Sequence, residues 1–232
     1  MKKKIVVLTG AGISAESGLS TFRDSGGLWE GHNVMDVASP EGWRRDKKLV
    51  LDFYNQRRQQ LTIAKPNDAH FALAELERSF DVTVITQNVD DLHERAGSNN
   101  IIHLHGELNK ACSTVNPDLI YELNGKDINI GDMCELGSQL RPYIVWFGEA
   151  VPKMEEAINH SLSAEIFIVI GTSLVVYPAA SLMEFVSGIS PKYLIDPKKP
   201  EFIYNQSNLY FIQKKATEGT RELVNKLLSN KY

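Results

Sequence analysis

Short continuous runs of apolar, mostly β-branched residues recur along this chain, and segments with a helical pattern separate them. A strand that is covered on both faces buries every side chain, so such runs are typical of parallel sheets flanked by helices. The alternation of strand and helix predicts a doubly wound parallel sheet of the α/β class. The expected strands are Lys4–Leu8, Val82–Thr86, Ile101–Leu104, Tyr143–Trp146, Ile166–Ile170, Tyr193–Ile195 and Leu209–Ile212.

Two stretches interrupt this alternation. Residues 26–62 are rich in Trp, Arg and Gln and indicate loops and helices, whereas residues 110–139 contain Asn, Asp, Gly and Pro with little periodicity. We expect both to form a smaller inserted lobe over one edge of the sheet, within a single domain that spans residues 1–232. The larger, Rossmann-like lobe then consists of residues 1–25, 63–109 and 140–232.

The composition excludes several classes of protein. A net charge of −4 gives no general electrostatic affinity for nucleic acid, and no run approaches the length of about 18 apolar residues of a membrane span. Two cysteines cannot form a disulfide framework, so we expect a reduced, cytoplasmic protein with no membrane and no nucleic-acid partner. The sequence indicates no particular oligomeric state.

A glycine loop follows the first expected strand. Residues Gly10–Ala15 contain G-x-G-x-x-A, a variant of the dinucleotide fingerprint, before an expected helix. Glycines there permit a tight turn and let backbone N–H groups approach a pyrophosphate. The acidic ribose ligand about 20 residues further on, typical of hydride-transferring enzymes, is absent. The loop therefore predicts nucleotide binding and disfavours a nicotinamide oxidoreductase.

Further motifs lie at the ends of other expected strands and cover most of the chain. Together with the glycine loop, and in the same order, they resemble the motifs of the sirtuin family. They are Thr21–Arg23, Gly27–Trp29, Thr86–Asp90, His103–Glu107, Val145–Glu149, Gly171–Leu174 and Val176–Pro178.

The resemblance implies an NAD-dependent protein-lysine deacylase. In the family reaction the bond between nicotinamide and ribose breaks, and the acyl oxygen of an acylated lysine attacks the sugar carbon. The products are nicotinamide, free lysine and an O-acyl-ADP-ribose. NAD is thus the implied co-substrate, and acylated-lysine proteins or peptides are the implied partners.

His105 is the candidate catalytic base. An imidazole with a pKa near 6.5 suits proton acceptance around neutrality, and a strand end is where open α/β sheets place their ligands. His103 lies two residues earlier and competes for the role. The family motif has its base directly before glycine, so the resemblance favours His105 and leaves His103 structural.

The resemblance also assigns residues to NAD. Asn88 is the second catalytic candidate and contacts the ribose with Gln87, while Asp90 orients nicotinamide. Arg23 lies near the phosphates and Phe22 shields the reacting carbon. Where the family usually has Asn, this chain has Asp196, which adds a negative charge. The full set of cofactor candidates is Gly10, Ala11, Gly12, Ala15, Phe22, Arg23, Gln87, Asn88, Asp90, Gly171, Thr172, Ser173, Asp196 and Ala216.

A peptide substrate is expected to pair with the end of the fourth expected strand and the residues that follow it. The resemblance implies that Val145, Trp146, Phe147 and Gly148 bind it by β-augmentation, which tolerates many sequences.

Tyr54 and Arg57 are candidates for selecting the acyl group. They stand three residues apart, so on a helix they share a face, where a phenol and a guanidinium can grip a carboxylate. This spacing, and Ala15, match the class III sirtuin subgroup that removes succinyl, malonyl or glutaryl groups. Acetyl removal is compatible with it, since a small group enters a larger pocket. The alternative is that Arg57 and Arg58 belong to an exposed helix face.

Cys112 and Cys134 resemble a degenerate zinc ribbon. Each retains one cysteine of a C-x-x-C pair that most sirtuins use to hold a structural zinc. Such a site needs four N or S ligands, so we expect no zinc.

Two other functions remain as alternatives. One is a catalytically weak module that binds NAD or ADP-ribose, against which the presence of His105, Asn88 and Asp90 counts. The other is a protein ADP-ribosyltransferase, which would leave Tyr54 and Arg57 without a role.

Overall fold

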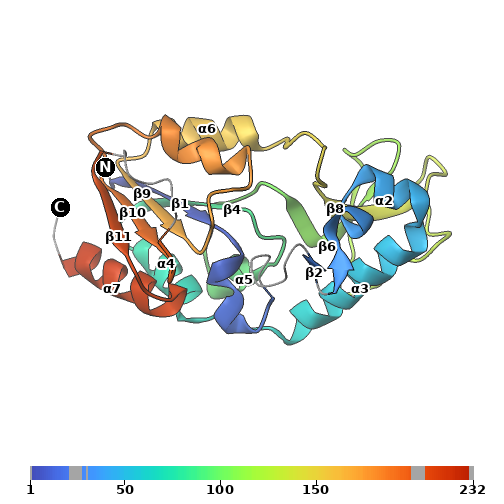
Figure 1. The fold of residues 1–232 in the computed structure, drawn as a ribbon, viewed down its shortest axis with the longest axis horizontal. Coiled ribbons are helices and arrows are strands. Elements are labelled where there is room, and N and C mark those ends of the chain that lie inside the picture. The colour runs from blue at the N-terminus through green and yellow to red at the C-terminus, as the bar shows by residue number, and fades with distance from the viewer. Residues whose placement is uncertain (1, 21–27, 30, 200–206, 230–232) are drawn as a thin grey trace.

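The computed structural model describes residues 2–20, 28–29, 31–199 and 207–229. In this part of the chain a larger lobe contains a six-stranded sheet, and a smaller lobe contains a three-stranded sheet and helices (Figure 1). No helix among the described residues combines the length and the apolar character needed to cross a bilayer.

The large sheet has the strand order β11-β10-β9-β1-β4-β5, and all neighbouring strands are parallel. The chain moves from β1 through β4 to β5 on one side and returns to β9, β10 and β11 on the other. The direction of winding thus reverses beside β1, where open α/β sheets bind ligands. The strands are β1 (Lys4–Thr9), β4 (Asp81–Thr86), β5 (Ile101–His103), β9 (Ile166–Ile170), β10 (Lys192–Ile195) and β11 (Leu209–Ile212).

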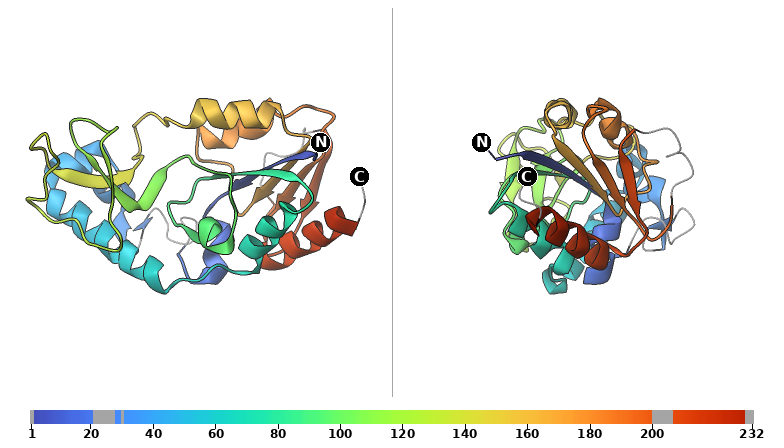
Figure 2. Two further views of the ribbon diagram at one scale, coloured as in Figure 1. Left: turned by 180° about the vertical axis from the view of Figure 1, so that it is seen from behind. Right: turned by 90° about the vertical axis from the view of Figure 1, so that its left-hand side faces the viewer.

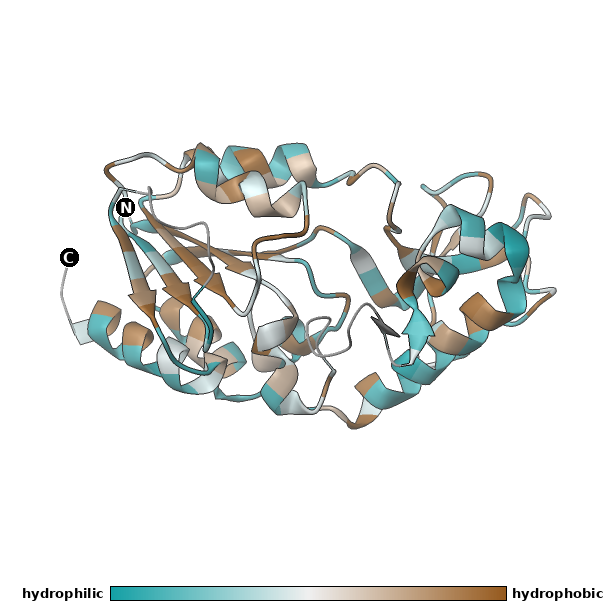
Figure 3. Cartoon of the chain, viewed as in Figure 1, coloured by the Kyte–Doolittle hydropathy of each residue, from teal (hydrophilic) through white to brown (hydrophobic). Residues whose placement is uncertain are grey.

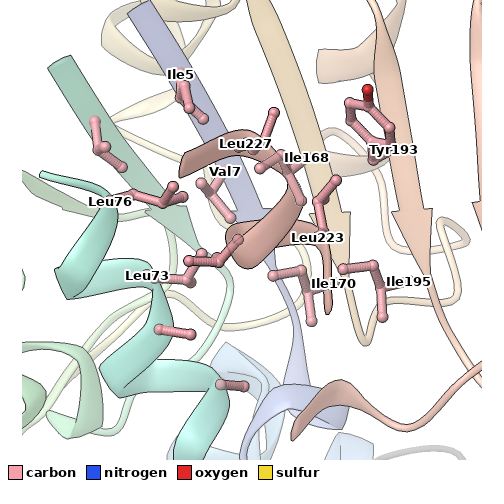
Figure 4. Close-up of a cluster of buried hydrophobic side chains, with 14 of the residues drawn as sticks. Ile5, Val7, Leu73, Leu76, Ile168, Ile170, Tyr193, Ile195, Leu223 and Leu227 are labelled. Carbon is pink, nitrogen blue, oxygen red and sulfur yellow. The ribbon is translucent and has the colours of Figure 1, made fainter. Parts of the chain in front are cut away.

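Both faces of this sheet are buried. Ile5 and Val7 of β1 pack in one apolar cluster, whereas Val6 and Leu8 pack in a second cluster on the opposite face. This explains the continuous apolar runs, because side chains alternate between faces along a strand. Figure 4 shows the first cluster, and Figure 3 shows the hydrophobic strands.

Helices cover the two faces of the sheet. In the views of Figure 2, α4 (Asp68–Leu76) and α7 (Ala216–Ser229) lie on one face, and α6 (Met154–Leu162) with the 3-10 segment Ala179–Phe185 lies on the other. The doubly wound α/β architecture expected from the sequence is confirmed. The short helix α5 (Leu92–Ala96) connects β4 to β5.

The small lobe has its own apolar core. Side chains of the long helix in this lobe pack against Leu108, Ala111, Ile144 and Trp146. Its three-stranded sheet is antiparallel, with the order β7-β6-β8. The elements are β2 (Leu28–Trp29), β3 (His32–Asn33), α1 (Val34–Val37), α2 (Pro40–Arg45), α3 (Lys47–Ile63), β6 (Gly106–Ser113), β7 (Ile120–Glu122) and β8 (Leu140–Ile144).

Two sequence expectations were wrong in detail. The strand expected at Tyr143–Trp146 is β8, which ends at Ile144 and pairs antiparallel with β6 in the small sheet. An apolar run does not reveal which sheet it joins, because that depends on long-range pairing. The helix expected after the glycine loop is instead two 3-10 turns, Ala11–Ile13 and Ala15–Ser17, which end at Gly18 in the left-handed conformation.

The small sheet also includes more residues than the expected insertion. Its strands run from Gly106 to Ile144, slightly beyond residues 110–139 on both sides. The lobe limits given above therefore remain a prediction.

Candidate active site

The glycine loop packs tightly against the end of β9. A Cβ atom at Gly12 would lie 2.6 Å from Cα of Gly171, and one at Gly10 would lie 2.8 Å from Cβ of Thr172. Gly171 itself has φ +61°, a conformation that favours glycine. Three glycines thus let the ends of β1 and β9 meet without side chains between them.

The loop N–H groups are used differently from the sequence expectation. Those of Gly10 and Gly12 donate to the carbonyls of Ile170 and Gly171, so they are occupied inside the protein. Among the described residues, the N–H groups of Ala11, Ala15 and Glu16 have no acceptor. These donors, rather than those of the glycines, are the ones that can bind an anion.

Asn88, Ser14 and Asp90 form a buried polar cluster after β1 and β4. Asn88 Nδ2 donates to Ser14 Oγ at 3.2 Å, and Ser14 Oγ donates to Asp90 Oδ2 at 3.0 Å. Burial raises the pKa of Asp90, while hydrogen bonds from the Leu92 N–H and from Ser14 lower it. The cluster joins residues from two separate loops, and Ser14 is the link.

His105 lies between β5 and β6, directly before Gly106, and beside this cluster. Its Nδ1 is 3.0 Å from the carbonyl oxygen of Gln87, so in the neutral ring Nδ1 carries the proton. The lone pair is then on Nε2, which has no hydrogen-bond partner among the described residues. Burial lowers the pKa of His105, and the bond to Gln87 offsets part of this effect. A neutral imidazole with an available Nε2 is what a general base requires.

His103 has partners on both ring nitrogens. Nε2 is 2.6 Å from Glu94 Oε1, and Nδ1 is 3.3 Å from the carbonyl oxygen of Asn88. Burial lowers the pKa of His103, but the contacts with Glu94 and the charge of Glu107 outweigh it, so the net pKa is raised. An imidazole with both ring nitrogens bonded is poorly suited to accept a proton from a substrate, which fits a structural role.

The end of β9 closes the other side of this site. Gln87 Nε2 donates to Thr172 Oγ1 at 3.1 Å, and the half-buried Ser173 follows. Asp196 lies directly after β10, is 1% exposed, and accepts a hydrogen bond from the Lys198 N–H at 2.9 Å. The structure thus brings residues of three strand ends to the same edge of the sheet.

The glycine loop also contacts the last helix. The Glu16 carboxylate accepts from the backbone N–H and the hydroxyl of Thr217 at 3.0 to 3.1 Å. Ala216, a cofactor candidate at the start of α7, is therefore beside the loop that carries Ala15. Phe22 and Arg23 lie outside the described residues.

The segment expected to pair with a peptide is irregular. The N–H groups of Val145 and Phe147 donate to the carbonyls of His105 and Ala38, and that of Trp146 donates to the Glu149 carboxylate. Gly148 follows with φ +90°. These N–H groups are bonded within the chain, and pairing of this segment with a peptide stays a prediction. Phe147 is 41% exposed, whereas Trp146 is buried.

Arg141 and Glu149 hold this segment in place. Arg141 makes two hydrogen bonds to the Glu149 carboxylate, at 2.7 and 2.9 Å, and its guanidinium lies 3.5 Å from the centre of the Trp146 ring. The Trp146 indole N–H donates to the Tyr54 hydroxyl at 3.1 Å. The peptide segment and the acyl-selecting candidate are thus in direct contact.

Tyr54 and Arg57 share a face of α3, as the spacing predicted. Both contact Trp29: the ring centres of Tyr54 and Trp29 are 6.2 Å apart, and the Arg57 guanidinium is 4.8 Å from the Trp29 ring centre. Tyr54 is fully buried and Arg57 is 9% exposed. A substrate carboxylate therefore reaches the Tyr54 hydroxyl only after neighbouring side chains move.

The alternative of an exposed arginine face is wrong. Arg58 is 1% exposed, and its Nη1 donates to the Tyr54 carbonyl and to Asn55 Oδ1. Burial lowers its pKa to about 10. Both arginines are thus on buried sides of α3.

The cysteines lie in different surroundings. Cys134 Sγ is 3.4 Å from Ser113 Oγ and 3.1 Å from Ser138 Oγ, whereas Cys112 Sγ is 4.0 Å from the Pro142 carbonyl oxygen. Within the described ranges, no group of three or more His, Cys, Asp or Glu side chains is placed to hold a metal. Cys134 is thus hydrogen-bonded to two serines, whereas Cys112 lies against a backbone carbonyl.

Several contacts of this site were not anticipated. Ser14 lies in the glycine loop, but it joins Asn88 to Asp90 only because this loop packs against the segment after β4. Trp29 joins Tyr54 to Arg57 by the same kind of long-range contact. The only signal in the sequence was their position inside motifs, which does not reveal a partner.

Fold and site together define an α/β protein in which loops at the carboxyl edge of the parallel sheet hold a neutral histidine with an available Nε2, with a second lobe beside it. The sequence model of the Sir2 family matches residues 10–178. A protein of Bacteroides thetaiotaomicron named NAD-dependent protein deacylase is 56% identical, with 95% of this chain and 96% of that protein covered. A Helicobacter pylori protein of the same name is 55% identical, with 97% and 98% covered.

Solved structures agree. A mutant Sir2 homologue in complex with ADP-ribose superimposes with a TM-score of 0.89 at 41% identity, covering 100% of this chain and 95% of that one. A Sir2 homologue in complex with NAD gives 0.87 at 40% identity, covering 98% and 90%. A Sir2 protein bound to an acetylated peptide gives 0.80 at 30% identity, covering 97% and 93%. The chain belongs to the Sir2 family.

Proposed function

We propose that this chain is an NAD-dependent protein deacylase, which moves the acyl group of a modified lysine to the ribose of NAD. Nicotinamide, free lysine and an O-acyl-ADP-ribose are released. The main support is the position of His105, which is neutral and has Nε2 available. Its Nδ1 is hydrogen-bonded to the carbonyl of Gln87, in the loop that bears Asn88 and Asp90. The Sir2 relatives named as deacylases support the same activity.

The edge of the sheet fits NAD. Gly10 and Gly12 let the loop pack against the end of β9, and in that position the N–H groups of Ala11, Ala15 and Glu16 are available to a pyrophosphate. When bound, NAD supplies the sugar carbon that receives the acyl oxygen. Asn88 holds the ribose and Asp90 the nicotinamide carboxamide.

His105 accepts the proton of a ribose hydroxyl in this proposal. The Gln87 carbonyl fixes the ring tautomer, so Nε2 faces the reaction as an acceptor. His105→Ala should abolish nicotinamide release without unfolding the protein. Retained nicotinamide release in a folded His105→Ala protein would remove His105 from the mechanism.

We further propose that the preferred acyl groups carry a carboxylate, such as succinyl or malonyl, and that acetyl is also accepted. Arg57 is close enough to the Tyr54 hydroxyl to lower its pKa, although burial raises that pKa more. Tyr54 accepts a hydrogen bond from Trp146 and keeps its own hydroxyl proton for donation. A donor beside a guanidinium suits a carboxylate.

The test compares NAD-dependent turnover of matched acetyl-lysine and succinyl-lysine peptides, followed by mass spectrometry. Tyr54→Phe and Arg57→Met should reduce succinyl turnover more than acetyl turnover. Equal losses on both peptides would contradict the acyl selectivity but keep the deacylase. Absence of turnover on either peptide, with NAD still bound, would favour the binding module, and ADP-ribose attached to protein would favour the transferase.

A further inference from the structure

Two threonines and a histidine form a buried chain behind the Asn88 loop. Thr9 and Thr86 end β1 and β4, are register partners, and are fully buried. Thr9 Oγ1 donates to Thr86 Oγ1 at 2.9 Å, and Thr86 Oγ1 also accepts from the Asn88 backbone N–H at 3.0 Å. His93 of α5 follows, with Nε2 3.1 Å from Thr9 Oγ1.

The hydrogen bond from Thr9 to Thr86 sets the direction of this chain. Thr9 has one hydroxyl proton, which it donates to Thr86. Its oxygen therefore accepts from His93, whose proton must be on Nε2. A hydroxyl that receives a hydrogen bond is held more firmly in its own direction of donation, because such chains are cooperative.

His93 lies in surroundings that keep it neutral. It is 1% exposed, and its Nδ1 is buried without a partner among the described groups. The fully buried His70 of α4 faces it, with ring centres 4.9 Å apart, and His103 of β5 lies beyond. Burial, together with these two imidazoles, lowers the pKa of His93 well below its usual value.

We propose that His93 is a positioning residue for NAD cleavage, acting through Thr9 and Thr86 on Asn88. The donation from His93 holds the Thr9 hydroxyl toward Thr86, and Thr86 then anchors the backbone N–H of Asn88. The side chain of Asn88 is held separately by Ser14. The backbone of Asn88 is thus held by Thr86 at the end of β4, and its side chain by Ser14 of the glycine loop. The inference rests on the proposed function, in which Asn88 holds the ribose.

The site gains from such an anchor because Asn88 lies in an irregular segment. After β4 the chain has no regular structure until α5, so neither a helix nor a sheet holds Asn88. A small displacement of a group that orients a substrate lowers the rate more than it lowers binding of distant parts of that substrate. Loss of the anchor should therefore reduce kcat for nicotinamide release while KM for the acyl peptide changes little.

The experiment uses three substitutions in the whole protein. His93→Leu removes the donor while keeping an apolar volume, and His93→Gln keeps an N–H donor. His160→Leu is the matched control, since His160 Nδ1 lies 3.2 Å from the hydroxyl of Thr83, another threonine of β4, away from the carboxyl end of that strand. We expect kcat to fall roughly tenfold in His93→Leu, to recover largely in His93→Gln, and to stay unchanged in His160→Leu.

A second readout is independent of turnover. The backbone N–H of Asn88 donates to the Thr86 hydroxyl. Hydrogen exchange of this N–H should therefore be faster in His93→Leu than in the wild type, and unchanged in His160→Leu. Should His93→Leu fail to fold, Thr9→Val tests the same link with a residue of the same size. A double variant of Thr9→Val and His93→Leu should be no slower than the worse single variant, since both break one chain.

The outcomes separate the two proposals. If the wild type turns over and His93→Leu keeps its kcat, or loses stability alone, the positioning role is refuted and the proposed function stands. If the wild type turns over neither peptide, the proposed function fails. Hydrogen exchange of the Asn88 backbone N–H then tests the anchor by itself. An exchange rate unchanged in His93→Leu then refutes the anchor, and a faster one supports it.

Discussion

The buried His70 should make the stability of this protein depend on acid. His70 is fully buried at the start of α4, and burial lowers its pKa from 6.5 to about 4. In the unfolded chain the same imidazole titrates near 6.5, so the unfolded state binds the extra proton first. This contribution to stability is complete above pH 6.5 and is lost as the pH falls toward 4.

The size of the effect follows from the difference between the two pKa values. Each pKa unit corresponds to about 1.4 kcal/mol, so a difference of about 2.5 units is worth roughly 3 kcal/mol at pH 4. That is a large share of the roughly 5–15 kcal/mol typical of folded domains. His93 adds to the effect in the same direction.

The measurement is urea unfolding of wild type and His70→Gln at several pH values between 7 and 4. His70 accepts from the Asn67 N–H in a capping box, and Gln at this position makes the same bond without titrating. The variant should be less stable at pH 7 but lose less stability in acid, so the two curves converge by roughly 3 kcal/mol. Parallel curves would refute the reasoning, because they would mean that His70 is protonated in the folded protein.

Three further predictions concern single positions. Gly12→Ala should weaken NAD binding strongly, because the added Cβ would clash with the end of β9. Gly188→Ala is the control, since a Cβ there meets nothing within 4 Å. Equal NAD affinities of the two variants, measured by calorimetry, would contradict this prediction. Gln139→Leu should lower the free energy of unfolding by about 1–3 kcal/mol, because it removes four hydrogen bonds between the Gln139 side chain and the backbone of residues 129–140. In the same denaturation assay, Gln59→Leu at an exposed position should change it little. The acidic limb of the rate–pH profile should have its midpoint below 6.5, because a base with a lowered pKa stays neutral until lower pH; a midpoint above 6.5 would contradict burial of His105.

The large sheet was predictable because its signal is local. A strand with both faces covered is apolar at nearly every position, so Ile166–Ile170 and Lys4–Leu8 could be located from their continuous apolar runs. The antiparallel sheet of the small lobe was not predictable in this way. In β7, Ile120 is 44% exposed, so the alternation that marks a half-buried strand is missing.

The site residues were predictable by motif, but their connections were not. Motifs at strand ends gave His105, Asn88 and Asp90, because parallel strands bring their carboxyl ends to one edge. The hydrogen bond between Trp146 and Tyr54 joins residues far apart in the chain, and no local pattern encodes it. The same holds for the hydrogen bond from the Gly12 N–H to the carbonyl of Gly171, directly after β9, which only the folded chain reveals.

The contact between Glu16 and Thr217 has a consequence for synthesis of the protein. The glycine loop leaves the ribosome long before the start of α7, yet the Glu16 carboxylate is bonded to Thr217 of that helix, and β1 pairs with the equally distant β9. The glycine loop and β1 therefore cannot form all their native contacts until residues 166–217 have emerged. NAD can stabilise only what it binds, so it should protect the released polypeptide from proteolysis and give no protection to nascent chains that end before residue 216.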